Sequence, residues 1–388
     1  MKNKPDFYFS LAWQRVAVGL SVGLAVLATH CGAAEAGNFD GARWSLLDAD
    51  QVIAAAKEIT TAKYPDSDQA TVDKKMVRVY RPDGTGESQD ETFTKVLTEK
   101  GKRANRDMTQ FFMLPYFTVE VPKLEIIKPG GERVPVDVAA NSKEMIDDSQ
   151  MSMNIYDPNM KLLKVNIPQL KVGDIVHSLV RTVIHRAIIE GQFSDSNLFE
   201  DSGVIRHLTY EVYEPGEKPL KHIVLRDEVP GTVKRSDEKL AGNVTLHRWE
   251  VTDVPRMFEE ASMPPGMEVL QRLLVSTSPD WEYVSKWYYT ICRPHLDATT
   301  PEMKATVAAL TKDSKTDLDR VKAVFYHVAQ KIRYMGITPE KDRPGFEPHD
   351  VNLTFDNKYG VCRDKAALLV SLLEAAGNED PPNADGFN

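Results

Sequence analysis

The sequence predicts a mixed α+β protein, in which a β-sandwich-like domain comes first and a helical region follows. Two observations lead to this prediction. Between residues 65 and 260, short apolar runs are separated by turns rich in Pro and Gly, a pattern typical of antiparallel strands. From residue 275 onward, apolar residues recur every three or four positions, as they do in helices that bury one face. We therefore expect a domain boundary near residues 255 to 275, around Pro255 and Pro264-Pro265-Gly266.

The composition is that of a globular protein with enough apolar residues for more than one core. Of the 388 residues, 42% are hydrophobic and 27% are charged, and the formal net charge is −9. No cluster of Lys and Arg resembles a grip on a phosphate backbone, so we expect no nucleic-acid partner. The histidines and cysteines do not have the spacing of metal ligands, so we expect neither a metal nor another cofactor.

The first 36 residues have the features of a signal peptide for export. A basic segment, Lys2 to Arg15, precedes an apolar stretch over residues 16–28, and Ala34-Glu35-Ala36 is a small-x-small cleavage site. The apolar stretch is short for a membrane span, and no second run of spanning length follows. We expect an exported protein of the periplasm, the cell envelope or the extracellular space, without an integral membrane segment after cleavage. Cys31 leaves lipidation open as an alternative.

One helix is expected before the strands, in the N-terminal segment 37–64. Residues 46–62 carry apolar side chains at helical spacing, namely Val52, Ile53, Ala56 and Ile59. The predicted strands that follow cover residues 76–80, 117–121, 124–127, 134–138, 175–183, 205–213 and 245–251. The order of short strands and turns favours a β-sandwich over residues 65–260, with a small barrel as the alternative.

Three helices of the second region begin at capping signals. Ser278-Pro279 and Thr300-Pro301 each place a capping side chain before a proline, and Thr316 with Asp319 resembles a capping box. In the first of these helices we expect Trp281 and Trp287 to anchor the core. The third helix has one apolar stripe, formed by Leu318, Val321, Val324, Phe325, Val328 and Ile332.

The candidate functional site is the segment Tyr359–Leu369. A turn that contains glycine brings Cys362 to the first turn of an apolar helix, which ends before Gly377. Free backbone N–H groups and the helix dipole at this position stabilise a thiolate, and the thiolate is the nucleophile. Two alternatives stay open: an inert buried thiol, or a disulfide with Cys292.

This segment resembles the nucleophile motif of the transglutaminase-like superfamily, which has a papain-like cysteine core. The matching positions are Gly360, Cys362, Asp364, Ala366, Leu368, Leu369, Leu372, Leu373 and Gly377. The N-terminal region resembles the domain of unknown function numbered 3857, which commonly precedes such cores in exported bacterial proteins. That resemblance is carried by Tyr64-Pro65-Asp66, Pro82-Asp83-Gly84, the segment 127–131 and the segment 170–176.

The resemblance implies amide acyl transfer or hydrolysis on a polypeptide or cell-envelope substrate, with Cys362 as nucleophile. Such chemistry needs a histidine base, an orienting carboxylate and oxyanion donors, and in the family the His and Asp follow the cysteine helix on strands. No histidine follows Cys362 here, and residues 378–388 lack a strand pattern. We therefore expect a partial core over residues 275–388, truncated before its β-sheet and inactive as written.

Four neighbours of the cysteine have alternative roles. His349, in the loop before the motif, is the nearest candidate base, although an exposed loop histidine is the alternative. Asp364 caps the helix or supports catalysis, and we favour capping. Arg363 adds positive charge beside the thiol or points to solvent, and Tyr334 lines a cleft or packs in the core.

Two functions of different class follow from these patterns. One is an exported transglutaminase-like cysteine enzyme. The other is a non-enzymic envelope protein for binding or scaffolding, which uses its β-sandwich to hold a polypeptide or a glycan. Substitution of Cys362 distinguishes them, because only the enzyme depends on the thiol.

Overall fold

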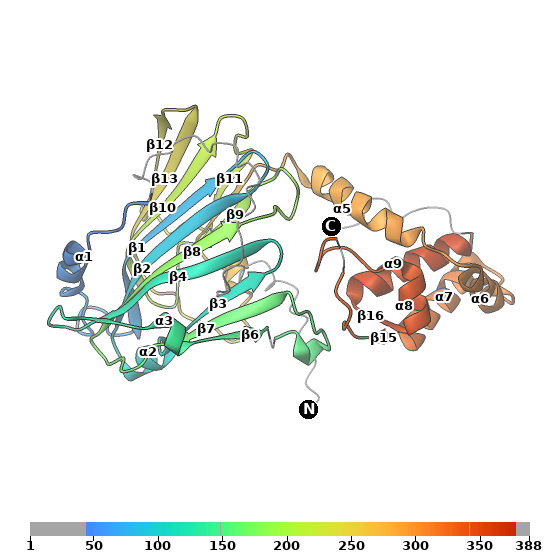
Figure 1. Cartoon of the computed structure of the whole chain (residues 1–388), viewed down its shortest axis with the longest axis horizontal. Helices are drawn as coiled ribbons and strands as arrows, with labels where there is room; N and C mark the ends of the chain where they lie inside the picture. Colours follow the sequence, from blue (N-terminus) through green and yellow to red (C-terminus); the bar gives the residue numbers. More distant parts are fainter. Residues whose placement is uncertain (1–43, 148, 341, 378–388) are drawn as a thin grey trace, which may run out of the picture. The chain divides into compact units, whose positions relative to one another are not determined.

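The computed structural model describes residues 44–147, 149–340 and 342–377. Strands dominate its first part and helices its last part, so the α+β prediction is confirmed (Figure 1). The predicted signal peptide, 1–36, and the tail at 378–388 lie outside the described residues.

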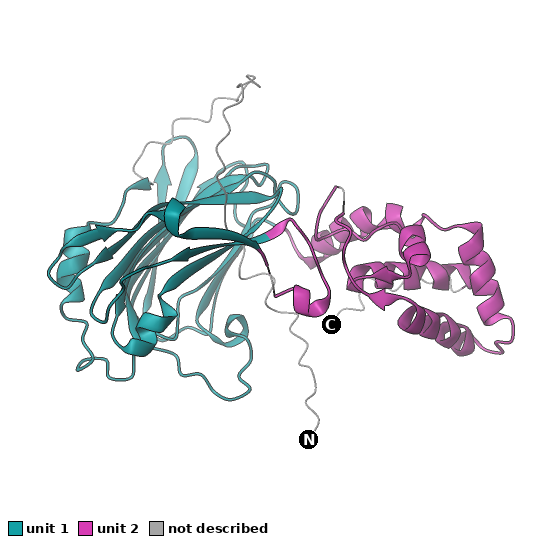
Figure 2. Ribbon diagram, turned by 60° about the horizontal axis from the view of Figure 1, so that its bottom comes forward, with its two compact units in different colours: residues 1–145, 161–278 teal, residues 146–160, 279–388 magenta. Residues whose placement is uncertain are grey.

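The chain divides into two compact units (Figure 2). Of the described residues, those within 44–145 and 161–278 belong to the first unit, and those within 146–160 and 279–377 belong to the second. In each unit the hydrophobic residues form cores of their own, so each is described separately below.

An eight-stranded sheet forms the body of the first unit (Figure 1). All its neighbouring strands are antiparallel except β1 and β10, which are parallel. The sheet is open, with β12 and β5 at its edges, so the barrel alternative is wrong. The strands in spatial order are β12 (Val233–Leu240), β13 (Val244–Val254), β10 (Val204–Pro215), β1 (Gln69–Tyr80), β2 (Gly86–Val96), β8 (Ile175–Ile184), β4 (Phe117–Ile127) and β5 (Arg133–Pro135).

A three-stranded sheet shares a hydrophobic core with the large sheet. Its strands in order are β11 (His222–Arg226), β14 (Arg272–Ser276) and β9 (Ser194–Leu198). Tyr80 of β1 stacks on Phe193 with ring centroids 4.2 Å apart, and Leu273 of β14 belongs to the same core. This two-layer packing is the sandwich-like arrangement that the strand pattern predicts. A further sheet has the order β3 (Asp107–Met113), β7 (Met160–Asn166) and β6 (Ser142–Ile146).

The predicted N-terminal helix is present but shorter than expected. Helix α1 covers Ala49–Ala56, because the Asp48 carboxylate accepts hydrogen bonds from the N–H groups of Asp50 and Gln51 and fixes the start. The predicted face is buried, with Val52 and Ala56 against the sheet core. The other helices of the unit are α2 (Glu99–Ala104), α3 (Val138–Asn141) and α4 (Gly266–Val269).

Strand β2 is the longest strand that the sequence pattern failed to predict. Its buried positions include the polar residues Gln89 and Glu91, which are 2% and 1% exposed. Glu91 is satisfied by His177, whose Nε2 lies 2.8 Å from the Glu91 Oε1. Because buried polar side chains replace apolar ones along β2, the alternation that identifies a strand is lost.

Five α-helices, one short 3-10 helix and a two-stranded pair are the main elements in the described part of the second unit (Figure 1). Segment 146–160 joins them, and in it Asn154 and Tyr156 exchange backbone hydrogen bonds with Gly336. The elements are η3 (Met151–Met153), α5 (Trp281–Leu296), α6 (Pro301–Thr311), α7 (Asp317–Lys331), β15 (Arg333–Tyr334), α8 (Val351–Asn357), β16 (Tyr359–Gly360) and α9 (Cys362–Ala375). Among residues 44–377, leaving out 148 and 341, no helix is long and apolar enough to cross a membrane.

The core of the second unit confirms part of the helical prediction and corrects part of it. Val324 and Val328 of α7 are buried against Leu368 of α9. Asp280, rather than Ser278, caps α5, and Trp281 is 85% exposed, so its prediction as a core anchor is wrong. The helix begins at Trp281, where a side chain has no preceding turn to pack on.

Candidate active site

Cys362 is the first residue of α9, and its side chain is exposed. The helix behind it is anchored by Leu368 and Leu372, which are both fully buried in the core of the second unit. The thiol therefore sits on a fixed helix end and remains open to a reactant. The alternative of a buried, inert thiol is wrong, and so is the disulfide, because Cys292 and Cys362 are both free.

Asp364 fixes the backbone that presents this thiol. It is 2% exposed, and its Oδ2 accepts a hydrogen bond from the N–H of Val361 at 2.9 Å. Its Oδ1 accepts from the N–H of His349 at 2.9 Å and lies 3.2 Å from the imidazole Nδ1 of the same residue. Burial alone would raise the pKa of Asp364, but these donors outweigh burial and lower it. Asp364 thus caps α9 and holds the preceding loop.

Gly360 is required by how closely the chain approaches Asp364. A Cβ atom added at Gly360 would lie 2.6 Å from the Cβ of Asp364 and 3.1 Å from the Cγ2 of Thr354. Strand β16 passes this point while paired with β15, with Gly360 opposite Tyr334. The Gly-x-Cys-x-Asp spacing therefore has a packing reason, since the carboxylate folds back over the glycine.

His349 lies against Asp364. Hydrogen bonding to Asp364 raises the pKa of His349, while burial opposes the shift. The imidazole Nε2 is buried and has no hydrogen-bond partner in the described part of the chain. Among the described residues, no hydrogen bond or ion pair joins His349 to Cys362. Its assignment as a base stays a prediction.

Tyr334 lies beside the thiol and is not a core residue. It is 37% exposed. Partial burial raises the pKa of its hydroxyl, and the neighbouring Cys362 thiol raises it further, while the backbone N–H of Cys362 lowers it. The core-packing alternative is therefore wrong. The short β15–β16 pair is what brings Tyr334 to the start of α9.

Arg363 is tied to the loop before the site and does not point freely to solvent. Its Nε donates to the carbonyl of Glu347 at 2.8 Å, and its guanidinium also contacts the carbonyl of Gly345 and the carboxylate of Glu340. Glu340 is itself buried, so this contact is shielded from water. Arg363 therefore fastens the loop at 340–347 to the start of α9.

Tyr288 of α5 also lies near the thiol, with Cys292 one turn further along the helix, and the sequence interpretation gave Tyr288 no place in the site. Burial raises the pKa of Tyr288, and the thiols of Cys292 and Cys362 raise it further. Burial likewise raises the pKa of Cys292. Tyr288 and Cys292 are four positions apart, so they share one face of α5, but nothing in the sequence indicates that this face meets α9.

A small cavity lies behind the motif, beside His349. Its volume of about 30 Å³ is room for little more than a water molecule. It is lined by Gly336, Thr338, His349, Thr354, Gly360 and Asp364 among others, but not by Cys362. No group of three or more His, Cys, Asp or Glu side chains within the described ranges is arranged to hold a metal ion.

Comparisons with known families match both units. Residues 66–258 match the model of the domain of unknown function DUF3857, and residues 304–379 match that of the transglutaminase-like superfamily. No curated protein sequence matches the chain.

One solved structure has the same fold over most of the chain. It is a protein of Parabacteroides distasonis named "putative protease", with a TM-score of 0.64 and 16% sequence identity. The match covers 80% of this chain and 59% of that one, so the chain spans about three fifths of the length of this neighbour.

Two other solved structures are similar only in part. The CBM3a-L domain of the scaffoldin CipA of Clostridium thermocellum has a TM-score of 0.19 and 13% identity, covering 31% of this chain and 69% of that one. Yeast leukotriene A4 hydrolase has a TM-score of 0.27 and 12% identity, covering 60% of this chain and 33% of that one. Scores this low carry no argument about fold or function.

Proposed function

Because residues 304–379 match the model of the transglutaminase-like superfamily and residues 66–258 match that of DUF3857, we propose that the chain is an exported protein of cysteine-dependent amide chemistry. Cys362 would attack an amide carbonyl of a polypeptide or cell-envelope substrate and form a thioester, which water or an amine then resolves. The observation that carries this proposal is a free, exposed thiol at the first position of a fourteen-residue helix, with Asp364 locking the turn beneath it.

The surroundings of Cys362 suit this role. The first backbone N–H groups of a helix have no acceptor within the helix, and the helix dipole favours negative charge at its start. A tyrosine hydroxyl has an ordinary pKa of about 10 and is protonated at neutral pH, and burial raises the pKa of Tyr334 further, so this hydroxyl can donate a hydrogen bond beside the sulfur. Arg363 holds the loop at 340–347 in place by contacts to backbone carbonyls.

The general base is the missing part of the proposed reaction. A histidine in contact with the thiol must accept its proton and later protonate the leaving amine. None of the described histidines contacts Cys362; the nearest in sequence, His349, is engaged by Asp364. We therefore propose that residues 44–377 hold the nucleophile, and that turnover requires a histidine supplied from outside them.

The experiment that tests this proposal is competitive alkylation of the folded chain. Iodoacetamide at neutral pH should label Cys362 about tenfold or more faster than Cys292, because Cys362 is exposed while burial raises the pKa of Cys292. Mass spectrometry of peptides gives both rates in one sample. Cys362→Ala should remove the fast phase and Cys292→Ala should leave it intact. Equal, slow labelling of the two thiols would refute the proposed nucleophile.

The second candidate function is a non-enzymic envelope protein, and one observation favours it. A cavity of about 330 Å³, larger than the one beside His349, lies in the first unit and is lined by none of the residues near Cys362. If binding through the first unit is the whole function, Cys362→Ala will leave ligand binding and phenotype unchanged. Loss of function in that variant would exclude this candidate.

A further inference from the structure

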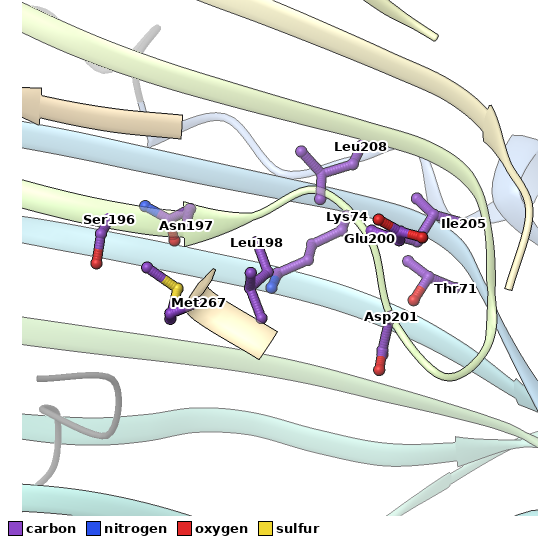
Figure 3. A pocket seen from close by; sticks show the side chains of 10 residues that line it. All are labelled: Thr71, Lys74, Ser196, Asn197, Leu198, Glu200, Asp201, Ile205, Leu208 and Met267. Atoms are coloured by element: carbon purple, nitrogen blue, oxygen red, sulfur yellow. The ribbon is translucent and has the colours of Figure 1, made fainter. Parts of the chain in front are cut away.

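A cavity of about 330 Å³ lies in the first unit, between the large sheet and β9. We propose that it binds a short peptide or amino-acid derivative through its free carboxylate and its ammonium group, with Lys74 receiving the carboxylate. Figure 3 shows the side chains that line it, with Lys74 and Leu198 in the middle of the view and Asp201 below them. The inference concerns the first unit alone and does not depend on Cys362.

Strands far apart in the sequence form the cavity wall. An irregularity in the pairing of β1 with β2, between Thr71 and Asp73, shifts the alternation of side chains. Thr71 and Lys74 can therefore face the same side although they are three positions apart, and both line the cavity. Segment 196–198 of β9 supplies the facing wall. Because most of the lining comes from paired strands, the polar groups are held in fixed positions.

Lys74 differs from the other cation on its side of β1. Arg78, four positions further on, binds Asp195 at 2.6 Å and also pairs with Asp90, while its guanidinium lies 5.5 Å from the centre of the Tyr210 ring. Lys74 is half-buried, and among the described residues it forms no hydrogen bond or ion pair. Two carboxylates neutralise the guanidinium of Arg78, whereas no carboxylate of the described residues neutralises the ammonium of Lys74. An anion that enters the cavity would complete it.

Two carboxylates of the lining are also available to a ligand. Glu200 accepts one hydrogen bond, from the N–H of Gln271 at 3.0 Å, and Asp201 accepts only from the N–H and hydroxyl of Ser202. Within the described ranges, neither forms an ion pair with a cation. The cavity therefore presents a positive group and two negative groups, none of them neutralised. This pattern matches a ligand that carries both charges, as the ends of a short peptide do.

The remaining walls define the middle of the ligand. Leu198, Ile205, Leu208 and Met267 give the cavity an apolar side, and Asn197 and Ser196 add amide and hydroxyl groups. The volume is at the lower end of the range for small-molecule sites, which suits an aliphatic dipeptide. No aromatic ring is in the lining, so a sugar would find no flat face on which to stack. The lining thus favours a peptide over a glycan.

The test is calorimetric titration of the full chain with the dipeptide L-alanyl-L-leucine. We expect saturable binding, and Lys74→Met should weaken it about tenfold or more, because a charge-assisted hydrogen bond is lost. A dipeptide whose carboxylate is replaced by an amide should bind the natural chain as weakly as the free dipeptide binds Lys74→Met. Lys74→Met itself should bind the amide and the free dipeptide with equal affinity. Asp201→Asn should weaken the free dipeptide but not its N-acetyl derivative.

Matched controls separate recognition from folding. Lys234→Met removes an exposed lysine from edge strand β12 of the same unit and should leave the affinity unchanged. Lys74→Arg should retain most of the binding, and thermal unfolding of Lys74→Met should match that of the natural chain. The proposal is overturned if the dipeptide does not bind, if Lys74→Met binds it as tightly as the natural chain, or if chitotriose binds in the cavity in its place.

Discussion

The cysteine site and the cavity of the first unit treat their charged groups in opposite ways. At the start of α9 the carboxylate of Asp364 and the guanidinium of Arg363 both have partners in the protein. Asp364 accepts hydrogen bonds from two backbone N–H groups and contacts the imidazole of His349, and Arg363 is held by Glu340 and by backbone carbonyls. In the cavity, Lys74 has no partner among the described residues. The first arrangement fixes a geometry around one reactive thiol. The second leaves an ammonium group without a partner in the protein, so that an anionic group of a ligand can bind it.

The difference predicts that the two places respond oppositely to loss of a charge. Asp364→Ala should lower the free energy of unfolding by about 3–5 kcal/mol, because it removes a buried carboxylate and leaves the N–H groups of Val361 and His349 without an acceptor. Urea unfolding followed by the helical circular-dichroism signal measures this loss. Asp313→Ala, at an exposed pair with Lys312, is the matched control and should be close to neutral. A loss below 1 kcal/mol in Asp364→Ala would mean that the contacts of this carboxylate do not stabilise the cysteine site.

Close packing beneath the cysteine gives the next largest effect. Gly360→Ala should cost about 1–3 kcal/mol, since its Cβ would lie 2.6 Å from that of Asp364 and force the start of α9 to move. Gly130→Ala is a suitable control, because a Cβ there has no atom within 4 Å. The same variant should also change the alkylation rate of Cys362. Unchanged stability and an unchanged rate would show that the glycine does not fix the thiol.

The His349–Asp364 pair should make the stability of the second unit depend on pH. The pKa of His349 is raised in the folded state. Its contribution to the free energy of unfolding is therefore complete below its ordinary pKa of about 6.5, and it is lost as the pH rises through the pKa of the folded state. The lowered pKa of Asp364 gives a contribution that is lost only when the pH falls below about 4. The pair therefore stabilises most between these limits.

His349→Gln tests this pH dependence. In the natural chain the free energy of unfolding should decline as the pH rises from 5 to 8, and in this variant the decline should disappear. His327 has the opposite sign, because burial lowers its pKa and its contribution is lost as the pH falls. His327→Gln is thus the matched comparison and should keep the decline. If His349→Gln keeps it too, the pair is not the titrating element.

The smallest effect is expected at Tyr334. Tyr334→Phe removes the hydroxyl beside Cys362 but leaves the half-exposed ring, so stability should change by less than about 0.5 kcal/mol. The alkylation rate of Cys362 and its pH profile should shift, because the thiol loses a polar neighbour. Tyr289→Phe, at a more exposed position on α5, should leave both unchanged. Identical profiles for all three proteins would place the hydroxyl outside the site.

Local features were predictable where a few neighbouring residues decide them. The cap of Thr300 before Pro301 and the Thr316–Asp319 capping box occur as expected, because a cap needs only side chains within one turn. The position of Cys362 at the start of α9 follows for the same reason. Trp281 was predicted wrongly because its exposure depends on what the rest of the fold offers to that end of α5.

The sequence by itself determined the α+β order of the two units and the five-residue segment that carries Gly360, Cys362 and Asp364, because strand alternation, helix period and helix capping are short-range effects. Only the tertiary structure decided the parallel pairing of β1 with β10, the burial of Glu91 against His177 and the meeting of Lys74 with segment 196–201. These contacts join residues about a hundred positions apart, and a sheet brings such residues together by hydrogen bonds between backbones, whose pairing the side-chain pattern does not specify.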